Sequence, residues 1–334
     1  MDGAVDNHPS HTDMDGHADT PLPLRIASVI DAADGIRSFE LVQPDGSELP
    51  EFTPGSHVKV QTPSGALRKY SLSNDPAERH RYVITVKRDD NGQGGSLSMH
   101  NEAHEGDTLP TSVPDNAFPL EEKARSYVFI AGGIGITPIL SMIRSFGELP
   151  PAPWKLYYLT RSPETTAFIE ELSAPELRKN VRIHHDHGNI DNAFDLWPVL
   201  EKPVSGAHVY CCGPRPLMEA VRDMTGHWSP KNVHFESFNE GGGVKPDDKP
   251  FNVVLAKSGK TFEVPVGKSI LATVLAHGCK AAYSCESGTC GTCRTTLISG
   301  EADHRDMVLM PEEMESQIMI CVSRAKSAEL VIDL

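Results

Sequence analysis

The chain has 334 residues and a formal net charge of −15 at pH 7, from 46 acidic and 31 basic side chains. This length allows two or three domains, and the strong acidic excess argues against nucleic acid as a partner. No apolar run reaches the roughly 18 residues of a membrane-spanning helix, and residues 1 to 23 lack the basic start and apolar stretch of a signal peptide, so we expect a soluble, cytoplasmic protein without a membrane partner.

Residues 1 to 23 are predicted to form a disordered tail. They carry five aspartates and no Lys or Arg, a composition that cannot bury enough apolar surface to fold. His8, His11 and His17 allow a second interpretation, in which the tail contacts a metal ion. The solvated tail is the simpler hypothesis.

Residues 24 to 120 are predicted to form an antiparallel β-barrel. Segments of strand length alternate or cluster apolar residues, and glycines separate them. These segments are RIASVIDAADGIRSFELVQP, HVKVQT, RKYSLSN and RYVITVKRD. Closing such strands into a barrel removes exposed sheet edges, which is why we favour this fold.

Residues 121 to 238 are predicted to form an α/β domain. SYVFIA, WKLYYLT, VRIHHDH and AHVYCCG have the character of strands, whereas PILSMIRSFGEL, TTAFIEEL and PLMEAVRDM have the character of helices. Strands and helices that alternate at this spacing favour a parallel sheet covered by helices on both faces.

Residues 239 to 250 are predicted to link this domain to a third one. The segment NEGGGVKPDDKP combines Gly, Pro and charge with almost no apolar content, which is typical of a flexible linker. Residues 251 to 334 then begin with a probable hairpin pattern, FNVVLA-KSGK-TFEVPV, and continue with the amphipathic helix KSILATVLAHG, which Gly278 is suited to end. The strands RTTLISG and AELVIDL complete this third domain.

Four cysteines of the third domain have the spacing of iron ligands. Cys285, Cys290 and Cys293 follow the pattern C-x4-C-x2-C, and Cys321 lies further along the chain. This spacing is typical of plant-type [2Fe–2S] clusters. Zinc and a disulfide are the alternatives, but only one close pair of cysteines is present, and disulfides are rare in the cytoplasm.

The sequence around these cysteines resembles plant-type ferredoxins, from SCESGTCGTC to the later MICVSRAKS. The resemblance implies a β-grasp fold and a one-electron carrier. Gly288 and Gly291 would let the loop wrap tightly around the cluster. Cys279 falls outside the pattern, and we expect it to be a packed or partly exposed thiol.

Two glycine-containing turns of the α/β domain are predicted to bind a dinucleotide. AGGIGITPIL is a strand-to-helix turn that presents backbone N–H groups suited to pyrophosphate, although it is not the G-x-G-x-x-G fingerprint. YCCGPRPLM repeats the arrangement, with Cys212 at the carboxyl edge of a strand, where α/β sheets bind ligands. A turn that only packs helix against sheet, and an inert core cysteine, remain the structural alternatives.

The segment RKYSLSN places side chains that could bind a cofactor on a strand of the barrel. Arg68 and Tyr70 share one face of that strand, and Ser71 points to the other. Arg68 suits a phosphate, Tyr70 suits a flat ring system, and Ser71 can donate a hydrogen bond to a ring nitrogen. Taken alone, the same segment is equally compatible with an ordinary strand.

RKYSLSN, GGIGITP and CCGP occur in the order found in the ferredoxin–NADP reductase superfamily. With a C-terminal ferredoxin domain, the chain resembles the phthalate dioxygenase reductase family, which includes vanillate demethylase reductases. The resemblance spans nearly everything from about residue 24 to the C-terminus. Methane-monooxygenase-type reductases differ, because their ferredoxin domain is N-terminal.

The resemblance implies FMN in the barrel and NADH in the α/β domain. For FMN it points to Arg68, Tyr70, Ser71, and the segment GGSLSMH with Gly94, Gly95 and Ser96. For the nicotinamide it points to Gly133, Thr137, Cys212, Gly213 and Pro214. Glu236 and Phe238 would close on the flavin ring, unless HFESF is only a segment at the sheet edge.

Ser71, Cys212 and Glu236 are the catalytic candidates that follow from this resemblance. Arg161 and Ser162 come just after a strand, where the 2′-phosphate of NADPH could be read. Similar sequence occurs in members of the family that use NADH, so we expect NADH.

The resemblance also implies the overall reaction. NADH would reduce FMN, and the [2Fe–2S] cluster would pass single electrons to a separate Rieske-type oxygenase, with the chain itself a monomer. A different acceptor, such as another hydroxylase or a cytochrome, is the first alternative. A non-enzymatic iron–sulfur redox sensor is the second, although a sensor needs no hydride donor and therefore leaves RKYSLSN and CCGPRPLM unexplained.

Overall fold

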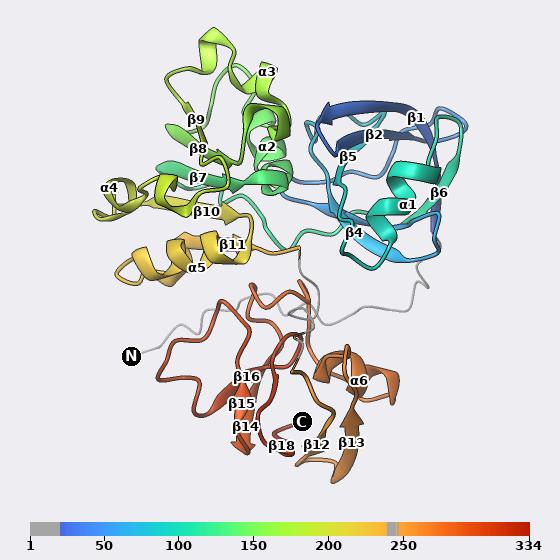
Figure 1. The fold of residues 1–334 in the computed structure, drawn as a ribbon, viewed down its shortest axis with the longest axis vertical. Coiled ribbons are helices and arrows are strands. Elements are labelled where there is room, and N and C mark those ends of the chain that lie inside the picture. Colours follow the sequence, from blue (N-terminus) through green and yellow to red (C-terminus); the bar gives the residue numbers. More distant parts are fainter. Residues whose placement is uncertain (1–20, 239–244, 246) are drawn as a thin grey trace, which may run out of the picture.

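The computed structural model describes residues 21–238, 245 and 247–334, which form three bodies, each built on its own β-sheet (Figure 1). The predicted tail, up to residue 20, and residues 239–244 and 246 of the predicted linker lie outside the described residues. In the part that is described, every helix falls short of the length or apolar character needed to cross a membrane.

The first body is a six-stranded antiparallel sheet with the strand order β4-β3-β6-β1-β2-β5. Its strands are β1 (Leu22–Ala33), β2 (Ile36–Val42), β3 (His57–Gln61), β4 (Leu67–Ser71), β5 (Tyr82–Lys87) and β6 (Thr108–Thr111). The two edge strands meet through the bridge between Leu72 and Ile84 and through the Ser73 N–H, which donates to Val83. The predicted barrel is therefore confirmed, and this short contact closes it.

Alternation of apolar residues along these strands fills the barrel interior. Phe39, Leu41 and Ile84 are fully buried there, together with Met99 from the helix α1 (Gly95–Glu102). The strand β1 starts at Leu22, slightly before the predicted boundary at residue 24, because Leu22 and Pro23 pair with β6.

The second body is a five-stranded sheet, entirely parallel, with the order β11-β10-β7-β8-β9. Its strands are β7 (Ser126–Gly132), β8 (Trp154–Thr160), β9 (Val181–His185), β10 (Ala207–Cys212) and β11 (Val233–Glu236). Its α-helices are α2 (Ile136–Arg144), α3 (Ile169–Leu172), α4 (Trp197–Leu200) and α5 (Arg215–Met224). Separate hydrophobic cores lie on its two faces, which confirms the predicted α/β layering.

Short 3-10 turns complete this body: η1 (Gly133–Gly135), η2 (Pro163–Thr165), η3 (Pro175–Leu177), η4 (Ile190–Asn192) and η5 (Pro230–Asn232). The predicted helix TTAFIEEL is reduced to the single turn α3. Phe168 has a φ of 59°, a left-handed conformation that prevents a helix from continuing through it.

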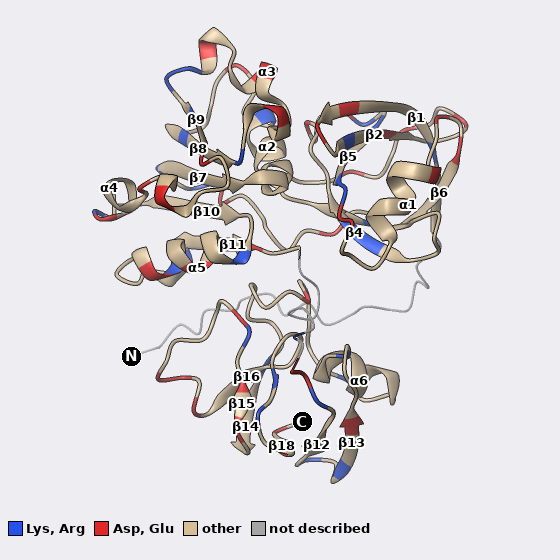
Figure 2. Cartoon of the chain, in the orientation of Figure 1, with Lys and Arg blue, Asp and Glu red and all other residues tan. Residues whose placement is uncertain are grey.

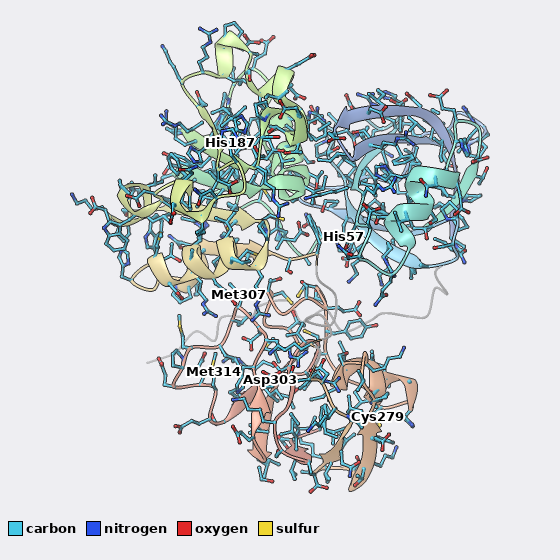
Figure 3. The ribbon with its side chains drawn as sticks, viewed as in Figure 1. His57, His187, Cys279, Asp303, Met307 and Met314 are labelled. Atoms are coloured by element: carbon cyan, nitrogen blue, oxygen red, sulfur yellow. The ribbon has the colours of Figure 1, made fainter. Side chains whose placement is uncertain are left out.

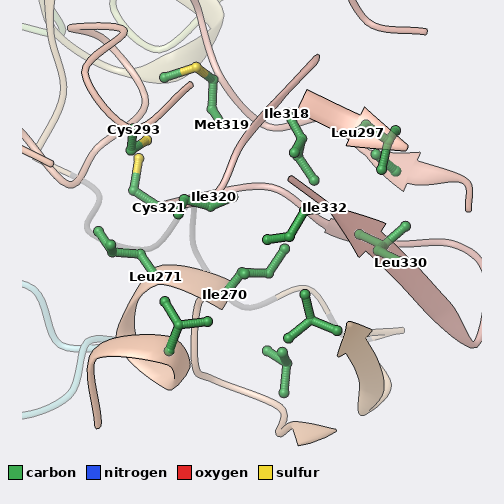
Figure 4. Packing of buried hydrophobic residues seen from close by; sticks show 14 of the residues in the cluster. Ile270, Leu271, Cys293, Leu297, Ile318, Met319, Ile320, Cys321, Leu330 and Ile332 are labelled. Atoms are coloured by element: carbon green, nitrogen blue, oxygen red, sulfur yellow. The ribbon is translucent and has the colours of Figure 1, made fainter. Parts of the chain in front are cut away.

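The third body is a mixed sheet with the order β13-β12-β18-β14-β16, together with the short pair β15–β17. Its elements are β12 (Phe251–Leu255), β13 (Lys260–Val264), α6 (Ile270–Ala276), β14 (Arg294–Ser299), β15 (Ala302–Asp303), β16 (Gln317–Met319), β17 (Arg324–Ala325) and β18 (Glu329–Ile332). Ile270, Ile320 and Ile332 belong to its core, and Cys293 and Cys321 lie at one edge of that core (Figure 4).

The start and end of α6 follow from local chemistry. The Ser269 hydroxyl accepts a hydrogen bond from the Ala272 N–H at 3.0 Å, which caps the first turn. Gly278 has a φ of 72° just after the helix, as predicted from the sequence. The loop that leaves this helix carries three of the four candidate cluster cysteines and returns to the sheet at β14.

Candidate functional site

The loop between α6 and β14 is shaped by glycine. Gly288 has a φ of 75°, and a Cβ placed there would lie 2.6 Å from Cγ2 of Val322. Gly291 has a φ of 83°. A side chain at Gly288 would therefore displace the segment that carries Cys321, so the tight loop needs glycine here.

The four candidate ligands form two pairs of thiols. The neighbouring Cys290 thiol lowers the pKa of Cys285. The neighbouring Cys321 thiol likewise lowers the pKa of Cys293. The Ser287 N–H also points at the sulfur of Cys285, at 3.4 Å.

This arrangement fits a [2Fe–2S] cluster, in which two cysteines bind each of two irons. Among the described residues, no three His, Cys, Asp or Glu side chains converge as a single zinc ion would require. All seven cysteines are free thiols. Cys279 is partly exposed, packs against the core of the third body, and has Nζ of Lys260 at 3.9 Å.

On the barrel, Arg68 lies against the start of α1. A Cβ added at Gly95 would be 3.1 Å from Nε of Arg68, and Nη2 of Arg68 donates to Gln93 at 3.0 Å. Gly94, with a φ of 85° and open space around it, caps the helix, and the Ser96 hydroxyl accepts from the Asp89 N–H at 3.1 Å. A guanidinium beside a helix N-terminus is suited to a phosphate group.

Ser71 and Glu236 face a cavity between the bodies. Both are buried, and Oγ of Ser71 and Oε2 of Glu236 have no hydrogen-bond partner among the described residues. Burial raises the pKa of Glu236 to about 8, and a negative charge on the nearby Cys285 sulfur adds to the rise. Buried polar atoms without partners can meet the hydrogen-bonding edge of a bound group. The cavity has a volume of about 30 Å³, so it has room for the edge of a flavin ring and not for the whole ring.

Residues from all three bodies line this cavity. They are His57, Lys69, Ser71, Ala117, Glu236, Ser237, Phe238, Cys285, Ser287 and Thr289. Phe238 is 40% exposed. Tyr70, on the other face of β4, is half-buried, and burial raises its pKa to about 12.

The two predicted dinucleotide turns touch each other. A Cβ at Gly135 would lie 2.2 Å from the Cys212 carbonyl oxygen, and one at Gly132 would lie 2.5 Å from Cδ of Pro214. Gly213 lies in the same contact. The sheet edge formed by β7 and β10 therefore brings the two turns together, because only glycines allow this approach.

The remaining predicted residues of this domain lie at the same edge of the sheet or just beyond it. Gly133 has open space around it, with a φ of 53°, and the buried Thr137 hydroxyl donates to the Ile134 carbonyl at 3.1 Å. Arg161 is exposed at the end of β8, and Ser162 caps the following 3-10 turn. Burial raises the pKa of Cys212 well above its ordinary value, so its thiol stays neutral.

Six of the ten residues that line the cavity were missed by the sequence analysis, and two of these, His57 and Lys69, can carry a positive charge. His57 lies where the barrel faces the other bodies (Figure 3). Its buried Nε2 has no hydrogen-bond partner in the described part of the chain, and Oδ2 of Asp115 lies 4.0 Å away. Lys69 forms an ion pair with Glu286 of the cysteine loop. One signal for Lys69 was available, because strand alternation puts it on the same face as Ser71.

Two family models match parts of the chain. A 2Fe-2S iron-sulfur cluster binding domain matches residues 253–326, and an oxidoreductase NAD-binding domain matches residues 129–223. The phthalate 4,5-dioxygenase oxygenase reductase subunit of Pseudomonas putida is 55% identical to this chain, with 93% of the chain and 96% of the relative covered. The phthalate dioxygenase reductase of Burkholderia cepacia is 54% identical, over 94% and 97%.

The chain belongs to the phthalate dioxygenase reductase family. A solved structure of phthalate dioxygenase reductase, described as modular for electron transfer from pyridine nucleotides to [2Fe–2S], superimposes with a TM-score of 0.73. It is 53% identical, and the alignment covers 95% of this chain and 98% of that one. Membership of the phthalate dioxygenase reductase family confirms the resemblance inferred from the sequence and the presence of the NAD-binding and cluster-binding domains.

Proposed function

We propose that this chain is the reductase component of a Rieske-type aromatic-ring dioxygenase or demethylase system, moving electrons from NADH through FMN and [2Fe–2S] to a separate oxygenase. One observation carries the proposal. The cluster ligand candidate Cys285 lines the same cavity as Ser71, Glu236 and Phe238. A flavin with one edge of its ring at that cavity would lie directly beside the cluster loop, as transfer of electrons between the two groups requires.

The barrel would hold FMN by its phosphate and by its ring. Arg68 and the start of α1, with Gly94, Gly95 and Ser96, would bind the phosphate. Phe238 would contact the ring, and the Ser71 hydroxyl and Glu236 carboxyl would meet its polar edge. Tyr70, on the same face of β4 as Arg68, would contact FMN between the phosphate and the ring. FMN supplies the chemistry by which a hydride, which carries two electrons, serves an acceptor of single electrons.

The α/β body would position the nicotinamide. Gly133, in the turn before α2, and Thr137, in its first turn, would bind the pyrophosphate, and Cys212, Gly213 and Pro214 would form the other side of the site. The neutral thiol of Cys212 adds no charge that would oppose arrival of a hydride donor. Arg161 and Ser162 lie beyond this contact, at the end of the neighbouring strand, and we assign them to the adenosine side of NADH.

The acceptor would approach the exposed side of the cluster. Cys285, Cys293 and Cys321 are buried, whereas Cys290 is exposed. Cys290 also lines an open cleft of about 680 Å³ between the second and third bodies. A separate oxygenase with an aromatic acid as substrate, such as a phthalate, is the partner that the relatives' names favour.

Anaerobic titration of the purified, iron-replete protein with NADH tests this proposal. We expect stepwise bleaching of flavin and then of cluster absorption, with a much weaker response to the same amount of NADPH. Mass analysis of the released flavin should give FMN. A spectrum that NADH leaves unbleached, or FAD as the released flavin, would contradict the proposal.

A further inference from the structure

Lys69 connects the barrel directly to the cluster loop. Its Nζ donates a hydrogen bond to the Cys285 carbonyl at 3.2 Å and to Oε1 of Glu286, also at 3.2 Å. Only 17% of the Lys69 side chain is exposed, against 35% of Glu286. The ammonium group therefore bridges two parts of the chain that lie 217 residues apart in sequence.

Glu286 is held in a conformation that needs support. Its φ is 57°, one of three positive values among the described residues other than glycine. Such a conformation persists only where surrounding contacts fix it. Lys69 supplies one of these contacts from another body. The conformation of the cluster loop therefore depends on the barrel being docked against it.

The charge of Lys69 lies beside the site where electrons arrive. One electron leaves the reduced flavin and the cluster gains it, with no bond formed or broken between them, so the cluster becomes more negative by one charge. A partly buried cation near Cys285 stabilises that added charge more than a solvated one would. Figure 2 shows the basic residues of β4 on the side of the barrel that faces the third body.

We propose that Lys69 is a positioning residue that docks the cluster loop against the flavin domain and makes the cluster easier to reduce. This inference rests on the proposed function and concerns its internal electron-transfer step. The effect on docking and the effect on the cluster potential can be separated by the sign of the change in potential. Removing Lys69 removes a positive charge, whereas removing the charge of Glu286 removes a negative one, yet each change breaks the same docking contact.

The test compares four variants of the full-length holoprotein: Lys69→Gln, Lys69→Arg, Glu286→Gln and the control Lys59→Gln. Lys59 lies opposite Lys69 in the β3–β4 ladder and makes no ion pair within the described segments. Lys59→Gln therefore removes the same charge as Lys69→Gln without breaking the contact to the cluster loop. Iron and sulfide content shows whether each variant keeps its cluster. The cluster potential, small-angle X-ray scattering and rapid-mixing kinetics with NADH are then measured.

For Lys69→Gln we expect the equilibrium between reduced flavin and reduced cluster to shift about tenfold toward flavin, which is about 59 mV for one electron. Glu286→Gln should shift it the opposite way. Both variants should have a larger radius of gyration and slower cluster reduction, with flavin reduction by NADH retained. Lys69→Arg and Lys59→Gln should behave like the parent protein.

Failure of this inference differs from failure of the proposed function. If NADH reduces neither the flavin nor the cluster in the parent protein, the proposed function is wrong. If NADH reduces both, and Lys69→Gln matches Lys59→Gln in cluster potential and in radius of gyration, Lys69 has no positioning role. The same conclusion holds if Lys69→Gln and Glu286→Gln shift the potential in the same direction.

Discussion

At the scale of residues, Arg68 illustrates how one side chain joins two elements. It leaves the strand β4, lies against Gly95 at the start of α1, and donates to Gln93 in the preceding loop. Strand alternation in the sequence is enough to place Arg68 and Tyr70 on one face of β4 and Lys69 and Ser71 on the other. It does not show that His57 and Lys69 line a cavity, because part of that cavity comes from the third body.

Replacing Arg68 with Leu should weaken FMN binding by about 10- to 100-fold, because a charge-assisted hydrogen bond to phosphate contributes roughly 1.5–3 kcal/mol. The measurement is fluorescence quenching as apoprotein is titrated with FMN. Arg25→Leu, at an exposed position on β1 of the same barrel, is the matched control and should bind FMN normally. Equal affinities for the two variants would place the phosphate elsewhere.

At the scale of elements, the nicotinamide turns depend on how closely β7 and β10 bring two backbones together. Glycines in AGGIGITP and CCGP predict a tight turn from the sequence, and the structure shows that the two turns need each other's glycines. The length of α3 could not be predicted in the same way. The left-handed conformation of Phe168 is imposed by packing and leaves no signal in helical periodicity.

Replacing Gly135 with Ala should destabilise the α/β body by about 1–3 kcal/mol, because overpacking forces backbone to move. The added Cβ would lie 2.2 Å from the Cys212 carbonyl oxygen, an atom of the backbone that cannot rotate away. Thermal unfolding of the holoprotein measures the change, and the rate of flavin reduction by NADH should fall with it.

Gly226→Ala is the control for this effect, since the nearest atom to its added Cβ is the Asp223 carbonyl oxygen at 3.7 Å. Its stability should stay within about 0.5 kcal/mol of the parent value. If Gly135→Ala unfolded at the temperature of Gly226→Ala, the close approach of the two turns would not be a constraint.

At the scale of the whole molecule, three independent sheets share one cavity. Changes of periodicity along the chain predict the three blocks and their order, and cysteine spacing predicts the cluster ligands. Docking leaves no such signal, because it depends on single contacts such as Arg215, whose Nη1 donates to the Arg305 carbonyl at 3.2 Å. The Arg305 side chain, with Asp248 and Asp303, then anchors the chain entering the third body. Of these residues, Asp303 is labelled in Figure 3.

Arg305 should therefore be far more sensitive to substitution than an exposed arginine of the same body. Its side chain is 2% exposed, and its partners Asp248 and Asp303 are 5% and 18% exposed. Arg305→Met would remove the guanidinium that the two carboxylates share and leave Asp248 with Arg324 at 3.7 Å and Asp303 with Lys245 at 3.1 Å. The expected cost is about 1.5–3 kcal/mol, the contribution of a hydrogen bond to a charged group. The measurement is urea unfolding of the cluster-containing protein, followed by visible circular dichroism.

The control is Arg294→Met, which breaks the pair with Glu313, where the side chains are 39% and 33% exposed. It should cost about 0–1 kcal/mol. The Arg305 guanidinium also lowers the pKa of Asp248 below its ordinary value of 3.8, so the contribution of this pair persists above pH 3.8 and is lost as the pH falls through the lower folded value. If Arg305→Met and Arg294→Met lost equal stability at neutral pH, the buried pair would not be what fastens the entering chain to the third body.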